Sequence, residues 1–174
     1  MSGPRSEPRT LADVMAQALA MEREAVQRYN ALADMMEVHH NREVEALFRK
    51  MAQIEAKHAA QIMAEMGWTD SSDMPVSERS PFAPDGPESV PEDAVHYLMW
   101  PWHALQLALS AEQRAETFYA RLAETAPSEA VRDAALQLRD EEREHVALMR
   151  AWIEKTPQPG SDWAEDPDPP LYTD

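Results

Sequence analysis

Apolar residues recur at alternating steps of three and four along four separate segments of the chain. This is the helical period, so each segment predicts a long helix with one face turned toward a core. The four stripes are Leu11, Met15, Ala18, Glu22, Ala25, Tyr29, Leu32 and Met36; Val44, Phe48, Met51, Glu55, His58 and Ile62; Leu105, Ala108, Glu112, Ala115, Tyr119 and Leu122; and Val131, Ala135, Leu138, Glu142, His145, Met149 and Trp152. The pattern predicts an all-α fold.

Residues that commonly begin or end helices stand at the borders of these segments. Thr10, followed three residues later by Asp13, predicts a capping box at the start of the first helix. Asn41 and Ser128 are placed to cap the second and fourth helices. Gly67 predicts the end of the second helix. The helix ends predicted from these residues therefore agree with the extent of the apolar stripes.

The segment between the second and third helices is not expected to be helical. Residues 68–91 contain five prolines and Gly86, a density of helix breakers that excludes a continuous helix. At about 3.3 Å per extended residue, this segment is long enough to return along a whole helix. We therefore predict a crossover connection. The third helix is clear from Trp102, with Pro101 either at a kink or in the first turn.

The two halves of the chain form an internal repeat. Glu22, Ala25, Tyr29, Leu32 and Ala33 match Glu112, Ala115, Tyr119, Leu122 and Ala123 at an offset of 90, and Glu55 and His58 match Glu142 and His145 at an offset of 87. The chain is therefore expected to form two helical hairpins joined by the crossover. The predicted organisation is a flexible N-terminus at residues 1–9, a four-helix bundle at 10–155 with the crossover at about 67–91, and an acidic, proline-rich tail at 156–174.

Six positions on the core-facing stripes carry ionisable side chains. These are Glu22, Glu55, His58, Glu112, Glu142 and His145. A buried ionised group costs several kcal/mol unless something compensates its charge. Antiparallel packing brings the two glutamates of each hairpin level, so all four glutamates can meet at the centre of the bundle. Two helices with a lone Glu and two with Glu-x-x-His supply the ligand set of dinuclear carboxylate metal sites in four-helix bundles.

The charges of these six side chains also fit a pair of metal ions. Four carboxylates and two neutral imidazoles balance two divalent cations. Oxygen and nitrogen ligation without sulfur suits iron or manganese, with zinc possible, and we expect two iron ions.

Other polar side chains lie on or beside the stripes without being predicted ligands. Tyr29 and Tyr119 follow their glutamates by one heptad, where a tyrosine either packs in the core or donates a hydrogen bond to a ligand. The sequence leaves both interpretations open. Glu24, Arg28 and Glu37 lie off the stripe, and we expect them on the solvated surface.

Composition narrows the functional classes. The chain has 174 residues, enough for one domain with a sizeable core, and no cysteine, which excludes disulfides, thiolate metal sites and a rubredoxin-like iron centre within it. A formal charge of −16 argues against nucleic acid as a partner. No stretch resembles a signal peptide or approaches the roughly 20 apolar residues of a membrane span, so we expect a cytoplasmic protein without a membrane partner.

The motifs together resemble the rubrerythrin branch of the ferritin-like superfamily. They are Glu22 with Ala25 and Tyr29, Glu55-Ala56-Lys57-His58, Glu112 with Ala115 and Tyr119, and Glu142-Arg143-Glu144-His145. The resemblance covers about residues 10–155. It implies a ferritin-like four-helix bundle, a di-iron site with one histidine for each metal, and Glu55 and Glu142 as bridging or chelating ligands beside Glu22 and Glu112. It also implies a homodimer.

The same resemblance implies an activity. Rubrerythrins reduce hydrogen peroxide at a di-iron centre with electrons from a rubredoxin-type iron, which this chain without cysteines does not contain. We therefore expect redox chemistry with peroxide or dioxygen and a separate electron donor. Typical rubrerythrins carry a further glutamate at the position of Ala115.

Other readings of the same residues stay open. They are an iron-handling protein that oxidises or sequesters iron, a non-catalytic metal-binding protein, and a dimanganese catalase-like enzyme. A membrane-bound quinone hydroxylase is disfavoured because no helix shows a second, exposed apolar face.

Overall fold

The computed structural model describes residues 10–69 and 100–160, which contain four α-helices and no β-strand. They are α1 (Leu11–Val38), α2 (Arg42–Met66), α3 (Pro101–Glu124) and α4 (Glu129–Glu154). The all-α prediction is confirmed. Pro101 is the first residue of α3, which selects the first turn over a kink.

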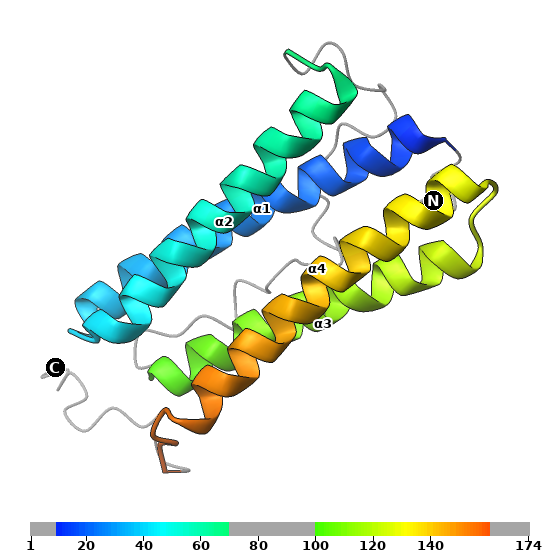
Figure 1. Cartoon of the computed structure of the whole chain (residues 1–174). Helices are drawn as coiled ribbons and strands as arrows, with labels where there is room; N and C mark the ends of the chain where they lie inside the picture. The colour runs from blue at the N-terminus through cyan, green and yellow to red at the C-terminus, as the bar shows by residue number, and fades with distance from the viewer. Residues whose placement is uncertain (1–9, 70–99, 161–174) are drawn as a thin grey trace, which may run out of the picture.

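The helices form two antiparallel hairpins that lie side by side (Figure 1). One hairpin is α1 with α2 and the other is α3 with α4, and α1 also contacts both helices of the second hairpin. The helices α2 and α3 run in the same direction, so α2 ends at the opposite end of the bundle from the start of α3 (Figure 1). Most of the predicted crossover, the N-terminal segment and most of the C-terminal tail lie outside the described residues.

The predicted caps form as expected. The Thr10 hydroxyl accepts from the Asp13 backbone N–H, and the Asp13 carboxylate accepts from the Thr10 N–H, both at 3.1 Å. The side chains of Asn41 and Ser128 accept from the third residue of their helices. Gly67 ends α2 with φ at 68°, a left-handed conformation that glycine adopts without strain. Local sequence therefore sets these helix limits.

The stripes form the core, with small departures at helix ends. Leu11 is exposed, and Trp152 is half-buried. Two apolar clusters fill the bundle. One includes Leu19 and Tyr119, and the other includes Phe48 and Met149. The polar stripe residues lie in the middle of the helices, so a charged layer is enclosed by apolar packing toward both ends.

None of the described helices is long and apolar enough to span a lipid bilayer.

Candidate metal centre

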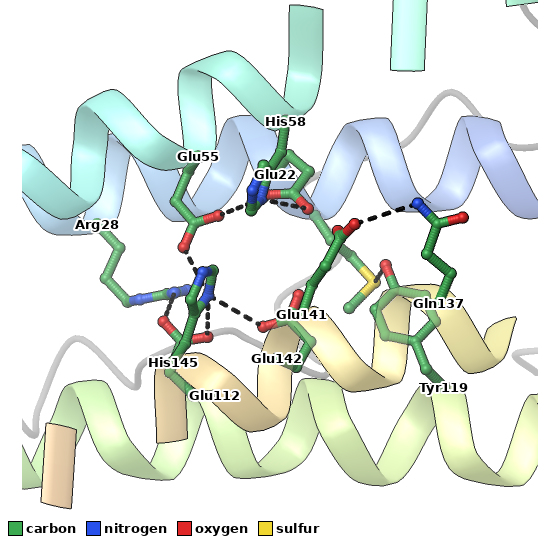
Figure 2. A network of polar contacts seen from close by, with 11 residues as sticks. Glu22, Arg28, Glu55, His58, Glu112, Tyr119, Gln137, Glu141, Glu142 and His145 are labelled. Atoms are coloured by element: carbon green, nitrogen blue, oxygen red, sulfur yellow. Dashed lines mark hydrogen bonds and ion pairs between the residues drawn. The ribbon is translucent and has the colours of Figure 1, made fainter. Parts of the chain in front are cut away.

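All six stripe residues predicted as metal ligands meet in the middle of the bundle (Figure 2). Each helix contributes from its central turns, because the stripe faces inward there. Five of the six are buried; these are Glu22, Glu55, Glu112, Glu142 and His145. The sixth, His58, is half-buried, with 22% of its side chain exposed. The repeat therefore folds into one site, with unequal access to solvent at its two histidines.

Glu55 lies at the centre of this group and faces both histidines. Its Oε1 atom is 3.1 Å from His145 Nδ1, and its Oε2 atom is 3.4 Å from His58 Nδ1. The two imidazole rings are nearly parallel, with centroids 5.6 Å apart. One carboxylate thus offers one oxygen to each half of the site, as a bridging ligand does.

The His145 side consists of Glu112, Glu142 and His145. His145 Nδ1 lies 3.5 Å from Glu112 Oε2 and 3.7 Å from Glu142 Oε2. All three side chains are buried, and one ligand atom from each lies within 4.8 Å of the other two. This side could hold one metal ion without access to bulk water.

The His58 side consists of Glu22, His58 and Glu141. His58 Nδ1 lies 3.7 Å from Glu22 Oε1. One ligand atom from each of the three residues lies within 4.8 Å of the other two, and both His58 and Glu141 are only half-buried. A second ion could bind here, nearer to solvent.

The donor atoms of the centre are placed to bind metal ions rather than to form hydrogen bonds with one another. Both oxygens of Glu55 and the Nδ1 atoms of His58 and His145 are buried without a hydrogen bond, although they lie close together. Buried polar atoms are almost always hydrogen-bonded, and leaving one without a partner costs about 1–3 kcal/mol. Four such atoms directed at one region form a donor set that fits a bound cation. The set of carboxylates and imidazoles without sulfur matches iron or manganese.

The pKa values of the side chains in the centre reflect the same crowding of charged groups. Burial alone lowers the pKa of His145, but the carboxylates of Glu112, Glu142 and Glu55 together raise that pKa far above its usual value. Burial acts to raise the pKa of Glu55, and the imidazoles of His145 and His58 reverse this effect and lower that pKa well below its usual value. The carboxylates of the folded chain are therefore charged and are stabilised by the positive charges of His145 and Arg28 beside them.

Arg28 was expected on the solvated surface, and this expectation was wrong. Its side chain is 7% exposed and its Nη2 atom lies 3.7 Å from Glu112 Oε1. The guanidinium also lies 5.1 Å from the centre of the Tyr29 ring. Position 28 is at the edge of the α1 stripe, and the long side chain reaches inward from there. Arg28 adds a permanent positive charge to the His145 side and lowers the pKa of Glu112 against the effect of burial.

The two tyrosines of the repeat contact different groups. The Tyr29 hydroxyl donates a hydrogen bond to Glu112 Oε1, which leaves Oε2 of the same carboxylate facing His145. Burial and the neighbouring Glu112 carboxylate raise the pKa of Tyr29 well above its usual value, so this phenol keeps its proton. The Tyr119 hydroxyl donates to Met21 Sδ at 3.4 Å. Tyr29 can orient a metal ligand, whereas the contact of Tyr119 is to a thioether.

Sequence reasoning missed Glu141 and Arg28. Both are visible as breaks in the repeat. At the offset of 87, Glu141 corresponds to Ile54, and at the offset of 90, Arg28 corresponds to Phe118. Comparison of the two repeats shows a charged residue in one half where the other half has an apolar residue. The stripe pattern alone does not make this comparison.

Comparison with known proteins agrees with this geometry. A sequence model of the rubrerythrin family matches residues 13–84. The crystal structure of an uncharacterised conserved protein from Magnetospirillum magnetotacticum MS-1 is similar, with 35% sequence identity and a TM-score of 0.73 over 87% of this chain and 98% of that one. No curated protein matches the sequence. Family model, solved structure and ligand geometry lead to one conclusion: the chain belongs to the rubrerythrin family of ferritin-like proteins.

Proposed function

We propose that this protein binds two iron ions among the four helices and reduces hydrogen peroxide with electrons from a separate donor. The observation that carries the proposal is the convergence of Glu55, His58 and His145, whose buried donor atoms have no hydrogen bonds. Glu22, Glu112 and Glu142 complete the ligand set around them. This is the arrangement of dinuclear carboxylate sites in four-helix bundles.

Each side chain has a distinct task in this proposal. Glu55 would offer one oxygen to the ion on each side of the site. Tyr29 holds Glu112 by a hydrogen bond and keeps its own proton. Arg28 offsets the negative charge of Glu112 near Oε1, the oxygen that accepts from Tyr29. The apolar clusters and the burial of Glu112, Glu142 and His145 keep bulk water away from the His145 side.

The reaction balances with two electrons. Iron held by these carboxylates and imidazoles would supply redox chemistry: reduction of one hydrogen peroxide to two molecules of water takes two electrons and two protons. The separate donor would supply the two electrons for each turnover. Dioxygen is the second oxidant that the same centre could take.

The test begins with metal content and ends with kinetics. Protein reconstituted with ferrous iron without oxygen is expected to hold two irons per chain by elemental analysis. Stopped-flow mixing of this form with peroxide and, separately, with dioxygen is expected to show much faster oxidation by peroxide. The Glu55→Ala variant serves as the control without a site. Absence of any bound transition metal in the unsubstituted protein would overturn the proposal.

An iron-handling function is the second candidate, and two observations favour it. An acidic pocket lined by Glu65, Asp133 and Glu141 reaches His58, and the position of Ala115 on α3 supplies no carboxylate. Iron content distinguishes the candidates. An enzyme stops near two irons per chain, whereas a storage protein takes up many more. Iron well above two per chain, or oxidation by dioxygen alone, would favour iron handling.

A further inference from the structure

A surface pocket reaches the His58 side of the candidate centre. Its volume is about 310 Å³, and residues of α1, α2 and α4 line it. Ile62 and Leu138 are among its apolar walls, and the exposed Asp133 lies on its border. His58 and Glu141 also line it, so the pocket connects solvent with the polar layer. The three residues of the His145 side do not line this pocket.

Glu141 approaches the centre from α4, one residue before Glu142. Its carboxyl end lies beside that of Glu22 (Figure 2). The Gln137 side-chain amide, one turn earlier on α4, donates to Glu141 Oε1 at 3.4 Å. A donor atom of Glu141 lies within 4.8 Å of donor atoms of Glu22 and His58. The carboxylate is therefore within the range in which three residues can share one ion.

A second observation points to a ligand in the same place. Glu55 is 1% exposed, and its Oε2 atom, which faces His58 Nδ1 at 3.4 Å, makes no hydrogen bond. The buried donor atom thus points toward the His58 side, where Glu141 stands at the boundary with the pocket.

The number of ligands on the two sides suggests what Glu141 does. Glu142 lies near His145 and is grouped with Glu112 rather than with His58, so the His145 side, counting the shared Glu55, has four protein ligands. The His58 side has only three if Glu141 is left out, because its other members are Glu22 and His58. Iron and manganese favour sites with many oxygen and nitrogen ligands. With Glu141 included, each side has four protein ligands.

We propose that Glu141 is a fourth protein ligand for the metal ion on the His58 side and that this ion exchanges with solvent through the pocket. This inference rests on the proposed dinuclear site and adds a carboxylate to it. It predicts two unequal binding steps. The enclosed ion on the His145 side is held more tightly, and the ion on the His58 side depends on Glu141.

The experiment is an anaerobic calorimetric and visible-absorption titration with Co²⁺, which is not oxidised under these conditions and reports its ligands through its spectrum. It compares the unsubstituted protein with Glu141→Gln, a change that keeps the shape of the side chain and removes the anionic ligand. Two matched controls are Glu144→Gln, an exposed position on the same helix, and Asp133→Asn, an acidic position on the same pocket. Circular dichroism checks that each variant is folded.

In Glu141→Gln, we expect the first Co²⁺ to bind unchanged and the second to bind at least about tenfold more weakly, with an altered spectrum for that ion alone. Both controls are expected to bind two ions as the unsubstituted protein does. Two unchanged steps in Glu141→Gln would overturn this inference and leave the dinuclear site intact. Equal weakening in Asp133→Asn would also overturn it, since it would assign the effect to pocket charge. Failure of the unsubstituted protein to bind any ion would instead sink the proposed function.

Discussion

The two sides of the candidate centre come from one repeated pattern but have different surroundings. The His145 side is buried, and Arg28 and Tyr29 both contact Oε1 of its Glu112 carboxylate. The His58 side borders a pocket and has Glu141 at its edge. Glu55 faces both. A repeat can therefore supply equivalent ligands while single substitutions decide how enclosed and how charged each half of the site is.

Both differences arise where the repeat is broken by a charge. Arg28 stands where the second half has Phe118, and Glu141 stands where the first half has Ile54. Both apolar counterparts are partly buried in the clusters that flank the polar layer. A cation is thus added to one side and an anion to the other. We expect the pair of sites to differ in metal affinity for this reason.

The largest effect is expected for the residue that both sides share. Among the described residues, Glu55 is the one carboxylate that faces both histidines, so we expect Glu55→Ala to lose both bound ions. In the unsubstituted protein, metal at 100 times its dissociation constant should raise the unfolding free energy by about 2.7 kcal/mol for each site. Thermal unfolding with and without metal should show this increase in the unsubstituted protein and none in the variant. Two ions retained in Glu55→Ala would contradict the bridging role.

Arg28 allows the environment of the His145 side to be changed without removing a ligand. Arg28→Met keeps much of the side-chain volume but deletes the cation next to the buried Glu112. We expect the metal-free protein to lose about 3–5 kcal/mol of stability, as when one partner of a buried ion pair is removed. Metal should reduce this loss because the bound ion compensates Glu112. Urea unfolding with and without metal measures both quantities.

An exposed ion pair in the same bundle gives the matched control. Arg143 on α4 lies 2.9 Å from Glu116 on α3, with 59% of the Arg143 side chain exposed. Arg143→Met should cost at most about 1 kcal/mol, because water screens exposed pairs. Equal costs for Arg28→Met and Arg143→Met would show that Arg28 is not tied to Glu112 as described.

Tyr29→Phe tests the orientation of Glu112 and is expected to have a smaller effect. Loss of the hydrogen bond from the phenol should weaken metal binding on the His145 side by about 10–100-fold, the range for groups that orient a ligand. Tyr119→Phe is the matched control, because its hydroxyl donates to Met21 Sδ, a weak acceptor. Metal titration of both variants should separate them, and equal affinities would remove Tyr29 from the site.

The sequence predicts the fold and the position of the polar layer well, for clear physical reasons. Stripes at helical spacing define the buried faces, and caps such as Thr10 and Gly67 define helix limits locally. A ligand for a central ion must lie on such a stripe, which is why Glu55 and His145 were predicted from periodicity. Arg28 and Glu141 could not be found this way. They lie beside the stripe, and only packed helices show that their long side chains reach the centre.

The most direct measurement is anomalous X-ray scattering at the iron edge from crystals of protein reconstituted with ferrous iron without oxygen. We expect two strong peaks in the middle of the bundle, one beside His145 and one beside His58, with Glu55 between them. At less than two irons per chain, the peak beside His145 should be the stronger. A single peak, or iron bound only at the outer surface, would contradict the account of a dinuclear centre with two unlike sides.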